Sequence, residues 1–248
     1  MIKHSAGLVS ISFRKYTVAE ILNNMQKCAL SYVEWGSDVH APCDDEKKLC
    51  EIAHMQNELG ISCCSYGTYF RLGITDVDEL ERYIYAAKIL GTDILRLWCG
   101  DRNSESYSEP EREKLFENSR RAAEIAKKYD ATLCMECHNN TYTETFEGAL
   151  ELVNSVNCKN FGMYWQPNQR LSFEDNLRYA SGISEYVRNV HVFNWKQGEK
   201  YPLAGAVDTW RKYLGCFDKP KKLLLEFMPD DRIESLLEES RALFEIIG

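Results

Sequence analysis

The sequence lacks long apolar runs, basic blocks and paired cysteine motifs. No stretch of about 18 apolar residues occurs, which excludes a membrane-spanning helix. The first 17 residues become polar too early for a signal peptide, so we expect a cytoplasmic protein. The formal net charge is −8, and no segment gathers Lys and Arg. Proteins that bind DNA or RNA through the phosphates usually need such a cluster, so we expect no nucleic-acid partner.

Cysteine is abundant, but its spacing excludes a zinc knuckle. The chain has ten cysteines, and the Cys-x-x-Cys pair Cys134 and Cys137 has no second pair to complete a four-ligand site. Residues three apart in a strand also point to opposite faces. We therefore expect free, mostly buried thiols in a reducing compartment.

The chain does contain eight apolar, β-branched or aromatic runs, and each predicts a strand. They cover residues 7–13, 31–36, 61–67, 93–100, 132–138, 161–167, 187–195 and 222–228. Helical spacing of apolar residues, with capping residues at the ends, predicts helices over residues 46–60, 76–91, 109–130 and 234–247.

Eight strands alternating with helices predict parallel βαβ units. In 248 residues, eight such units favour the α/β class and a closed (β/α)₈ TIM barrel, formed as a single domain over residues 1–248. An open doubly wound sheet would normally show a Gly-rich phosphate turn after its first strand, and none follows residues 7–13.

Polar side chains stand at the predicted carboxyl ends of the strands, where barrels of this kind build their active sites. Glu136 and His138 are two residues apart and therefore share one strand face. Each such residue alone could be a solvated or core residue. Together, carboxylates and imidazoles are the donors that Mn²⁺, Mg²⁺, Co²⁺ or Zn²⁺ require. The other residues of this set are Glu34, His40, Ser65, Arg96, Gln166, Asn168, His191 and Glu226.

The segments "VEWGSDVH", "SYGTYFRLG", "LCMECHNNT", "VHVFNW" and "LLLEF" stand at these strand ends. With them the sequence resembles the xylose isomerase-like TIM-barrel superfamily, in the branch of sugar phosphate isomerases and epimerases. The resemblance implies one divalent metal ion, held by Glu136, His191 and Glu226. Gln166 stands where the family usually carries an Asp ligand. Because its amide oxygen brings no charge, we expect weaker metal binding, with Asn168 or water as alternative donors.

The resemblance also implies a reaction and roles for individual residues. Proton transfer next to a carbonyl, through an enediolate, would use Glu136 and Glu226 as catalytic base and acid. The residues expected to bind the substrate are Glu34, His40, Arg96, Trp98, His138, Asn168 and Lys200. A small sugar or a sugar phosphate is the expected partner, and a homo-oligomer is compatible with the sequence.

Three alternatives to an isomerase or epimerase follow from the same residues. A lyase or dehydratase acting on a keto sugar or an inosose-like substrate would use the same proton abstraction. A non-catalytic sugar-binding protein would explain the missing Asp. An apurinic endonuclease is disfavoured, because the chain has only five histidines and an acidic balance.

Overall fold

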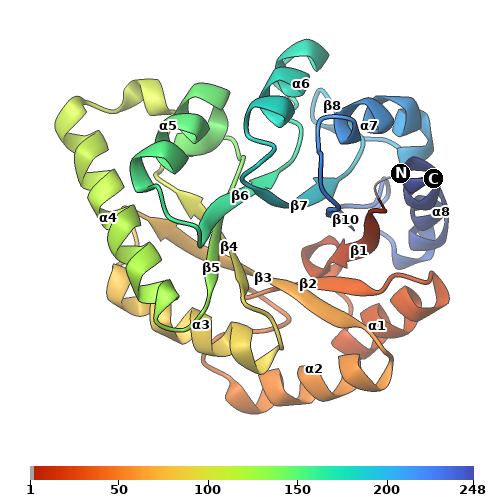
Figure 1. The fold of residues 1–248 in the computed structure, drawn as a ribbon. Coiled ribbons are helices and arrows are strands. Elements are labelled where there is room, and N and C mark those ends of the chain that lie inside the picture. Colours follow the sequence, from red (N-terminus) through yellow and green to blue (C-terminus); the bar gives the residue numbers. More distant parts are fainter. Residues whose placement is uncertain (1–2) are drawn as a thin grey trace.

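Parallel strands close into a barrel in the computed structural model, which describes residues 3–248 (Figure 1). Met1 and Ile2, part of the expected domain, lie outside the described residues. The barrel strands are β1 (Ser5–Val9), β2 (Tyr32–Gly36), β3 (Ser62–Leu72), β4 (Ile94–Cys99), β5 (Thr132–Glu136), β6 (Phe161–Trp165), β7 (Val187–Val192) and β10 (Lys222–Leu225). They neighbour one another in chain order, and β10 pairs with β1 to close the ring.

Helices follow the strands and form an outer layer around them (Figure 1). Within residues 3–248 they are α1 (Val18–Lys27), α2 (Glu46–Glu58), α3 (Leu80–Ile89), α4 (Glu109–Lys127), α5 (Phe146–Val156), α6 (Phe173–Gly182), α7 (Val207–Leu214) and α8 (Leu236–Ile247). The predicted (β/α)₈ barrel is confirmed, and the four predicted helices coincide with α2, α3, α4 and α8.

Local sequence signals account for the ends of several helices. Thr17 and Glu20 form a capping box at the start of α1, in which each side chain bonds the other residue's backbone N–H. Gly60 and Gly91 follow α2 and α3 with φ of +67° and +84°, a conformation that glycine adopts without steric cost. These helix ends hold the loops that lead back into the next strands.

The barrel has two hydrophobic cores, one on each side of the sheet. The larger cluster packs the strands against the helices, and the smaller one fills the barrel interior. Cys134 belongs to the interior cluster and Cys137 to the outer one, so this pair does point to opposite faces. The interior cluster consists of Val9, Ile11, Cys64, Cys134, Tyr164 and Leu224. It forms the packed floor on which the polar residues of the barrel mouth stand.

Six of the eight predicted strands end earlier than expected, whereas β3 extends beyond residue 67 to Leu72. The first was predicted over residues 7–13, but β1 ends at Val9 and Ser10–Phe13 forms a 3₁₀ helix. The hydroxyls of Ser10 and Ser12 accept backbone N–H groups from Gly36 and Phe227, which draws the chain out of the sheet.

The seventh strand was predicted over residues 187–195, but β7 ends at Val192. Trp195–Lys196 (β8) and Glu199–Lys200 (β9) instead pair as a short antiparallel hairpin. Its two turn residues, Gln197 and Gly198, both have positive φ, as a tight two-residue hairpin turn requires.

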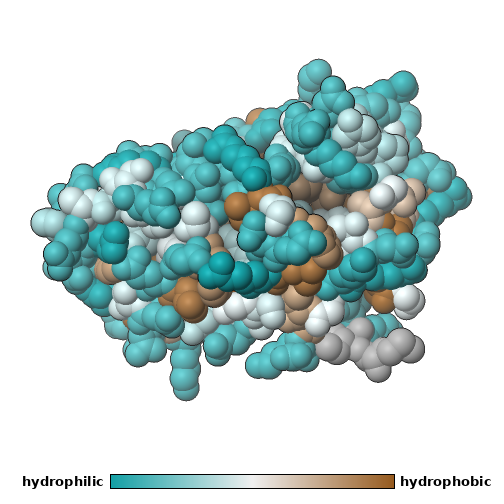
Figure 2. All heavy atoms as spheres, turned by 90° about the horizontal axis from the view of Figure 1, so that it is seen from above, coloured by the Kyte–Doolittle hydropathy of each residue, from teal (hydrophilic) through white to brown (hydrophobic). Residues whose placement is uncertain are grey.

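The surface is mostly polar, with hydrophobic residues in small patches on the face drawn in Figure 2. Among residues 3–248, none of the helices combines the length and apolar character that a bilayer crossing demands. All ten cysteines are free thiols, as predicted, and six of them are buried: Cys28, Cys63, Cys64, Cys99, Cys134 and Cys137.

Candidate metal centre at the barrel mouth

A cavity of about 300 Å³ opens at the carboxyl ends of the barrel strands. Its lining combines polar and aromatic side chains. The polar lining includes Arg14, Arg96, Glu136, His138, Gln166, Asn168 and Glu226. The aromatic lining consists of Tyr69, Trp98, Phe193, Trp195 and Phe227. A cavity with this mixture suits a small polar molecule that also has an apolar face.

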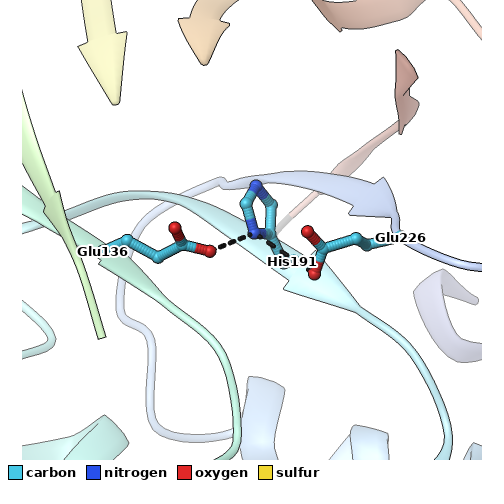
Figure 3. A group of neighbouring side chains, drawn as sticks. All are labelled: Glu136, His191 and Glu226. Carbon is cyan, nitrogen blue, oxygen red and sulfur yellow. Dashed lines mark hydrogen bonds and ion pairs between the residues drawn. The ribbon is translucent and has the colours of Figure 1, made fainter. Parts of the chain in front are cut away.

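Three strands that lie far apart in the sequence bring together Glu136, His191 and Glu226 (Figure 3). Glu136 is the last residue of β5, and His191 lies near the end of β7. Glu226 follows β10 directly, where its N–H donates to Val192 O at 2.9 Å and extends the strand pairing. All three side chains are buried, and one donor atom from each lies within 4.8 Å of the other two.

Oxygen atoms surround one ring nitrogen of His191. Nδ1 lies 3.2 Å from Glu136 Oε1, 3.3 Å from Gln166 Oε1 and 3.6 Å from Glu226 Oε2. A ring nitrogen carries at most one hydrogen, so it cannot serve three acceptors at once. Imidazole nitrogen and carboxylate or amide oxygen are, however, the donors that a divalent cation takes. The four side chains therefore fit a metal ion.

The two oxygens of Glu136 have different surroundings. Oε2 accepts hydrogen bonds from Arg96 Nη1 at 2.8 Å and from Trp98 Nε1 at 2.6 Å. Oε1 is left to face His191. Burial raises the pKa of the Glu136 carboxyl, but the charge of Arg96 outweighs burial and holds that pKa well below its usual range. Glu136 is therefore an anion with one oxygen directed toward the other donors.

The pKa values of Glu226 and His191 are raised, whereas that of Glu136 is lowered. Burial, with the negative charge of Glu136, raises the pKa of the Glu226 carboxyl to about 7 despite the opposing charge of His191. Burial lowers the pKa of the His191 imidazole, but Glu226 and Glu34 outweigh it and raise that pKa to about 10. The cluster thus attracts positive charge, which is the property that a cation site needs.

Glu34 lies deeper in the barrel than these residues and is absent from the cavity lining. Its side chain is fully buried on β2, where Oε1 accepts from Arg96 Nε at 2.9 Å and Oε2 from Ser65 Oγ at 2.7 Å. Burial raises the pKa of the Glu34 carboxyl, but Arg96 and these hydrogen bonds bring it to about 2.

The expected substrate-binding residues divide into two groups. Arg96, Trp98, His138 and Asn168 line the cavity, with the Trp98 and His138 rings 5.1 Å apart. Glu34, His40 and Lys200 do not line it.

The prediction that Glu34 binds sugar hydroxyls does not fit its fully buried position below the cavity floor. His40 is also buried, with its ring nitrogens 3.2 Å from Ser10 Oγ and 3.1 Å from Tyr16 O. It lines a separate cavity between α1 and α2. Lys200 pairs with Asp231 and stands over the Phe227 ring, 5.3 Å from its centroid.

Sequence reasoning missed several residues around the centre. Tyr164 and Asn189 lie two residues before Gln166 and His191, so period-two alternation on β6 and β7 would have placed them in the interior. Tyr164 donates to Ser65 Oγ at 2.5 Å, and Asn189 bonds to the Tyr164 hydroxyl.

Arg14 at the cavity rim was missed as well, because it follows an unexpected 3₁₀ helix. Its Nε donates to Asp38 Oδ2 at 2.7 Å, and the same oxygen accepts from the Tyr69 hydroxyl at 3.0 Å. Phe227, directly after Glu226, has a φ of +61° and stacks on Trp195 with ring centroids 4.9 Å apart. No local sequence pattern signals either arrangement.

A closed eight-stranded parallel barrel with acidic, amide and imidazole donors at its mouth defines a TIM barrel with a candidate metal centre. Residues 22–213 match the family model described as "Xylose isomerase-like TIM barrel". The chain belongs to this family.

Relatives within this fold carry out different reactions. Over 84 residues the chain is 26% identical to a 3-dehydroshikimate dehydratase of Bacillus anthracis, covering 34% of this chain and 30% of that protein. Among solved structures, a probable 3-DHS dehydratase of Bacillus anthracis superimposes with a TM-score of 0.78 and 16% identity, covering 97% of this chain and 98% of that one.

A D-psicose 3-epimerase of Clostridium cellulolyticum H10 superimposes with a TM-score of 0.68 and 12% identity, covering 97% of each chain. At these identities the structural matches establish the shared fold.

Proposed function

We propose that this protein is a metal-dependent sugar isomerase or epimerase that moves a proton on the carbon next to a carbonyl group. The observation that carries the proposal is the pair of buried carboxylates, Glu136 and Glu226, which lie on either side of His191 (Figure 3). Two carboxylates at one buried centre can remove a proton from one side of a carbon and return it from the other.

The residues of the metal centre would be Glu136, Gln166, His191 and Glu226, with one divalent cation. A cation held by these residues would supply Lewis-acid chemistry, which would make a C–H next to a carbonyl more acidic. Arg96 and Trp98 donate hydrogen bonds to Oε2 of Glu136, and these bonds fix the direction of Oε1. Glu226 has no such hydrogen-bonded cation among the described residues, which leaves it the freer of the two to exchange a proton.

The cavity lining supports a small polyhydroxylated substrate. Among the lining residues, His138 and Asn168 offer polar groups, and Trp98 and Trp195 offer aromatic rings. Aromatic faces pack well against the C–H side of a sugar, while amide and imidazole groups bond its hydroxyls. A volume of about 300 Å³ is sufficient for one small molecule of this kind.

A dehydratase acting on a keto sugar or a related cyclic ketone is the second candidate. The similarity to a 3-dehydroshikimate dehydratase over 84 residues favours it. The first step is the same proton abstraction, and the two reactions diverge afterwards. An isomerase or epimerase returns a proton to the substrate, whereas a dehydratase expels a hydroxyl group from the neighbouring carbon as water.

Deuterium exchange tests the shared step and separates the two candidates. The protein, supplied with Mn²⁺, is incubated in D₂O with ketopentoses, ketohexoses, their phosphates and cyclic polyhydroxy ketones. The manganese is removed, and the products are analysed by NMR and mass spectrometry. Deuterium on the carbon next to the carbonyl, in a product of otherwise unchanged composition, supports the isomerase or epimerase. Loss of one water molecule supports the dehydratase.

Buried glutamates elsewhere in the chain give a matched control. Glu136→Gln and Glu226→Gln should each abolish exchange, because each removes a base and a metal ligand. Glu239→Gln changes a buried glutamate on α8, outside the cavity lining. This variant should catalyse deuterium exchange into the substrate like the wild type. Exchange that persists in both barrel-mouth variants would exclude these two carboxylates as the proton carriers.

A further inference from the structure

Glu34 contacts the candidate metal centre from below without reaching the cavity. Its side chain has no exposed surface, and it is absent from the cavity lining. A residue in this position cannot touch a substrate held in the cavity. Its carboxylate nevertheless approaches both His191 and Arg96, which do border the centre.

The two ring nitrogens of His191 face opposite environments. Nδ1 faces the three oxygens described above. Nε2 is buried and has no hydrogen-bond partner within ordinary distance, but it lies 3.5 Å from Oε1 of Glu34. A carboxylate on this side favours a hydrogen on Nε2, which leaves the Nδ1 lone pair free for a cation.

Arg96 connects Glu34 to a second residue of the centre. Its Nε donates to Glu34 at 2.9 Å and its Nη1 donates to Glu136 at 2.8 Å, with both carboxylates buried. Glu34, Glu136 and Glu226 oppose one guanidinium, so the cluster keeps a net charge of −2 when His191 is neutral. Without the charge of Glu34 the net charge would change from −2 to −1, and Glu136 alone would pair with Arg96, which leaves less negative charge for a cation.

The surrounding structure holds Glu34 in this position. Ser65 donates to its second oxygen, and Tyr164 donates to Ser65. Gly67 on β3 leaves room for the Glu34–Arg96 pair, because a Cβ there would lie 2.7 Å from Glu34 Oε1. The pair is therefore built into the barrel interior.

We propose that Glu34 is a positioning residue for the metal centre, which orients His191 and offsets the charge of Arg96. This inference rests on the proposed metal-dependent function. Because Glu34 acts through His191 and Arg96, its effect appears in metal affinity and in the form of the imidazole, before any reaction takes place.

Calorimetric titration with Mn²⁺ compares the wild type with Glu34→Gln, which keeps the side-chain shape and removes the charge. We expect affinity about 10–100-fold weaker in the variant. Glu34→Asp keeps the charge and should retain more of the affinity than Glu34→Gln. Glu239→Gln, the buried glutamate on α8, is the control and should bind Mn²⁺ like the wild type.

Nitrogen-15 NMR of His191 with Zn²⁺ bound provides a readout that a merely structural role would not change. At a Zn²⁺ concentration that just saturates the wild type, we expect its His191 to hold zinc on Nδ1 and hydrogen on Nε2 only. In Glu34→Gln we expect a mixture of this form with zinc-free rings, part of which carry hydrogen on Nδ1. A single Nε2–H form in both proteins, with equal Mn²⁺ affinity, would overturn the inference.

The two proposals fail in different ways. A wild-type protein that binds no divalent cation refutes the metal-dependent function. If the wild type binds Mn²⁺ and Glu34→Gln binds it equally tightly, only the proposed role of Glu34 is refuted. If Glu34→Gln does not fold, Ser65→Ala carries the test, because it frees one oxygen of Glu34 and leaves its charge. We expect severalfold weaker Mn²⁺ binding in Ser65→Ala, and unchanged binding would then overturn the inference.

Discussion

Gln166 brings a neutral amide oxygen to a centre whose other oxygen donors are carboxylates. Its Oε1 lies 3.3 Å from His191 Nδ1, close to the oxygens of Glu136 and Glu226. The side chain is only 9% exposed, so solvent screens a charge at this position weakly. The choice of amide or carboxylate here therefore affects cation affinity directly.

Replacing Gln166→Asp should strengthen Mn²⁺ binding about tenfold or more, which corresponds to about 1.4 kcal/mol. The reason is the added negative charge beside a divalent ion, at a reach one methylene shorter. Isothermal titration with Mn²⁺ on the two proteins measures the change. The control is Asn168→Asp, which adds the same charge at the cavity but two residues further along. It should have a smaller effect, and equal gains in both variants would show that Gln166 is not a ligand.

At the residue scale the sequence predicted which donor groups meet at the barrel mouth. Strand-end placement brought together Glu136, His191 and Glu226, and the structure places their donor atoms within 4.8 Å. Strand-end placement did not indicate that Glu34 is fully buried outside the cavity lining, because position along a strand does not tell how deep in the barrel a side chain lies. His40 is similar, since the loop after β2 carries it away from the mouth toward α1 and α2.

Strand β3 provides the close packing beneath the metal centre. Its pairing with β2 shifts register between Val33 and Glu34, so Cys64 is an extra residue in β3. The bulge lets Cys64 join the interior cluster while the adjacent Ser65 still reaches Glu34. Gly67 follows, with no side chain to occupy the space of the Glu34–Arg96 pair.

Gly67→Ala should destabilise the protein by about 1–3 kcal/mol and weaken Mn²⁺ binding. The added Cβ would lie 2.7 Å from Glu34 Oε1 and 2.8 Å from Arg96 Nη2, and these buried groups have little room to move. Chemical denaturation and metal titration measure the two effects.

Gly205→Ala is the matched control for this change, since its new Cβ would meet nothing closer than Asn194 at 3.6 Å. We expect little loss of stability there. If the Gly67 and Gly205 variants were equally stable, β3 and its neighbours would have moved to make room for the new Cβ at little cost in free energy.

The sequence predicted the order and type of the elements well but not their ends. Apolar runs identified all eight barrel strands because barrel strands are buried on both sides. The end of β1 depends on hydroxyls that bond Gly36 and Phe227, and such partners are invisible to a local pattern. The bulge in β3 also arises from pairing with another strand.

A buried carboxylate outside the cavity lining, Glu239, joins α8 to the segment that follows β9. Glu239 is 5% exposed and accepts the backbone N–H of Leu203, at the start of the 3₁₀ helix Leu203–Ala206. Burial, with a smaller contribution from Asp230, raises the pKa of the Glu239 carboxyl to about 7, although the Leu203 hydrogen bond opposes the shift. We propose that residues 1–248 form one domain, so this group affects global unfolding.

Glu239 should make stability fall as the pH rises from about 4.5 to about 7. In this interval the unfolded chain releases the proton while the folded protein retains it, which favours unfolding. We expect a loss of about 1–3 kcal/mol from this group, which is complete above pH 7. Urea denaturation of wild type and Glu239→Gln at pH 5, 6, 7 and 8 measures it. The stability of the variant relative to the wild type should rise over this range, in a single unfolding transition.

Parallel stability curves for the two proteins would contradict the shifted pKa of Glu239. Two separate unfolding transitions would contradict the single domain.

The pairing of β1 with β10 also determines when the metal centre can exist. Ser5–Val9 is synthesised before the other barrel strands, and its partner Lys222–Leu225 is synthesised after them. Glu226 directly follows β10, so one of the proposed ligands arrives only as the ring closes. A nascent chain that ends before β10 would lack both the closing strand and the carboxylate of Glu226. Tight cation binding would therefore follow closure of the barrel and could not promote the earlier steps of folding.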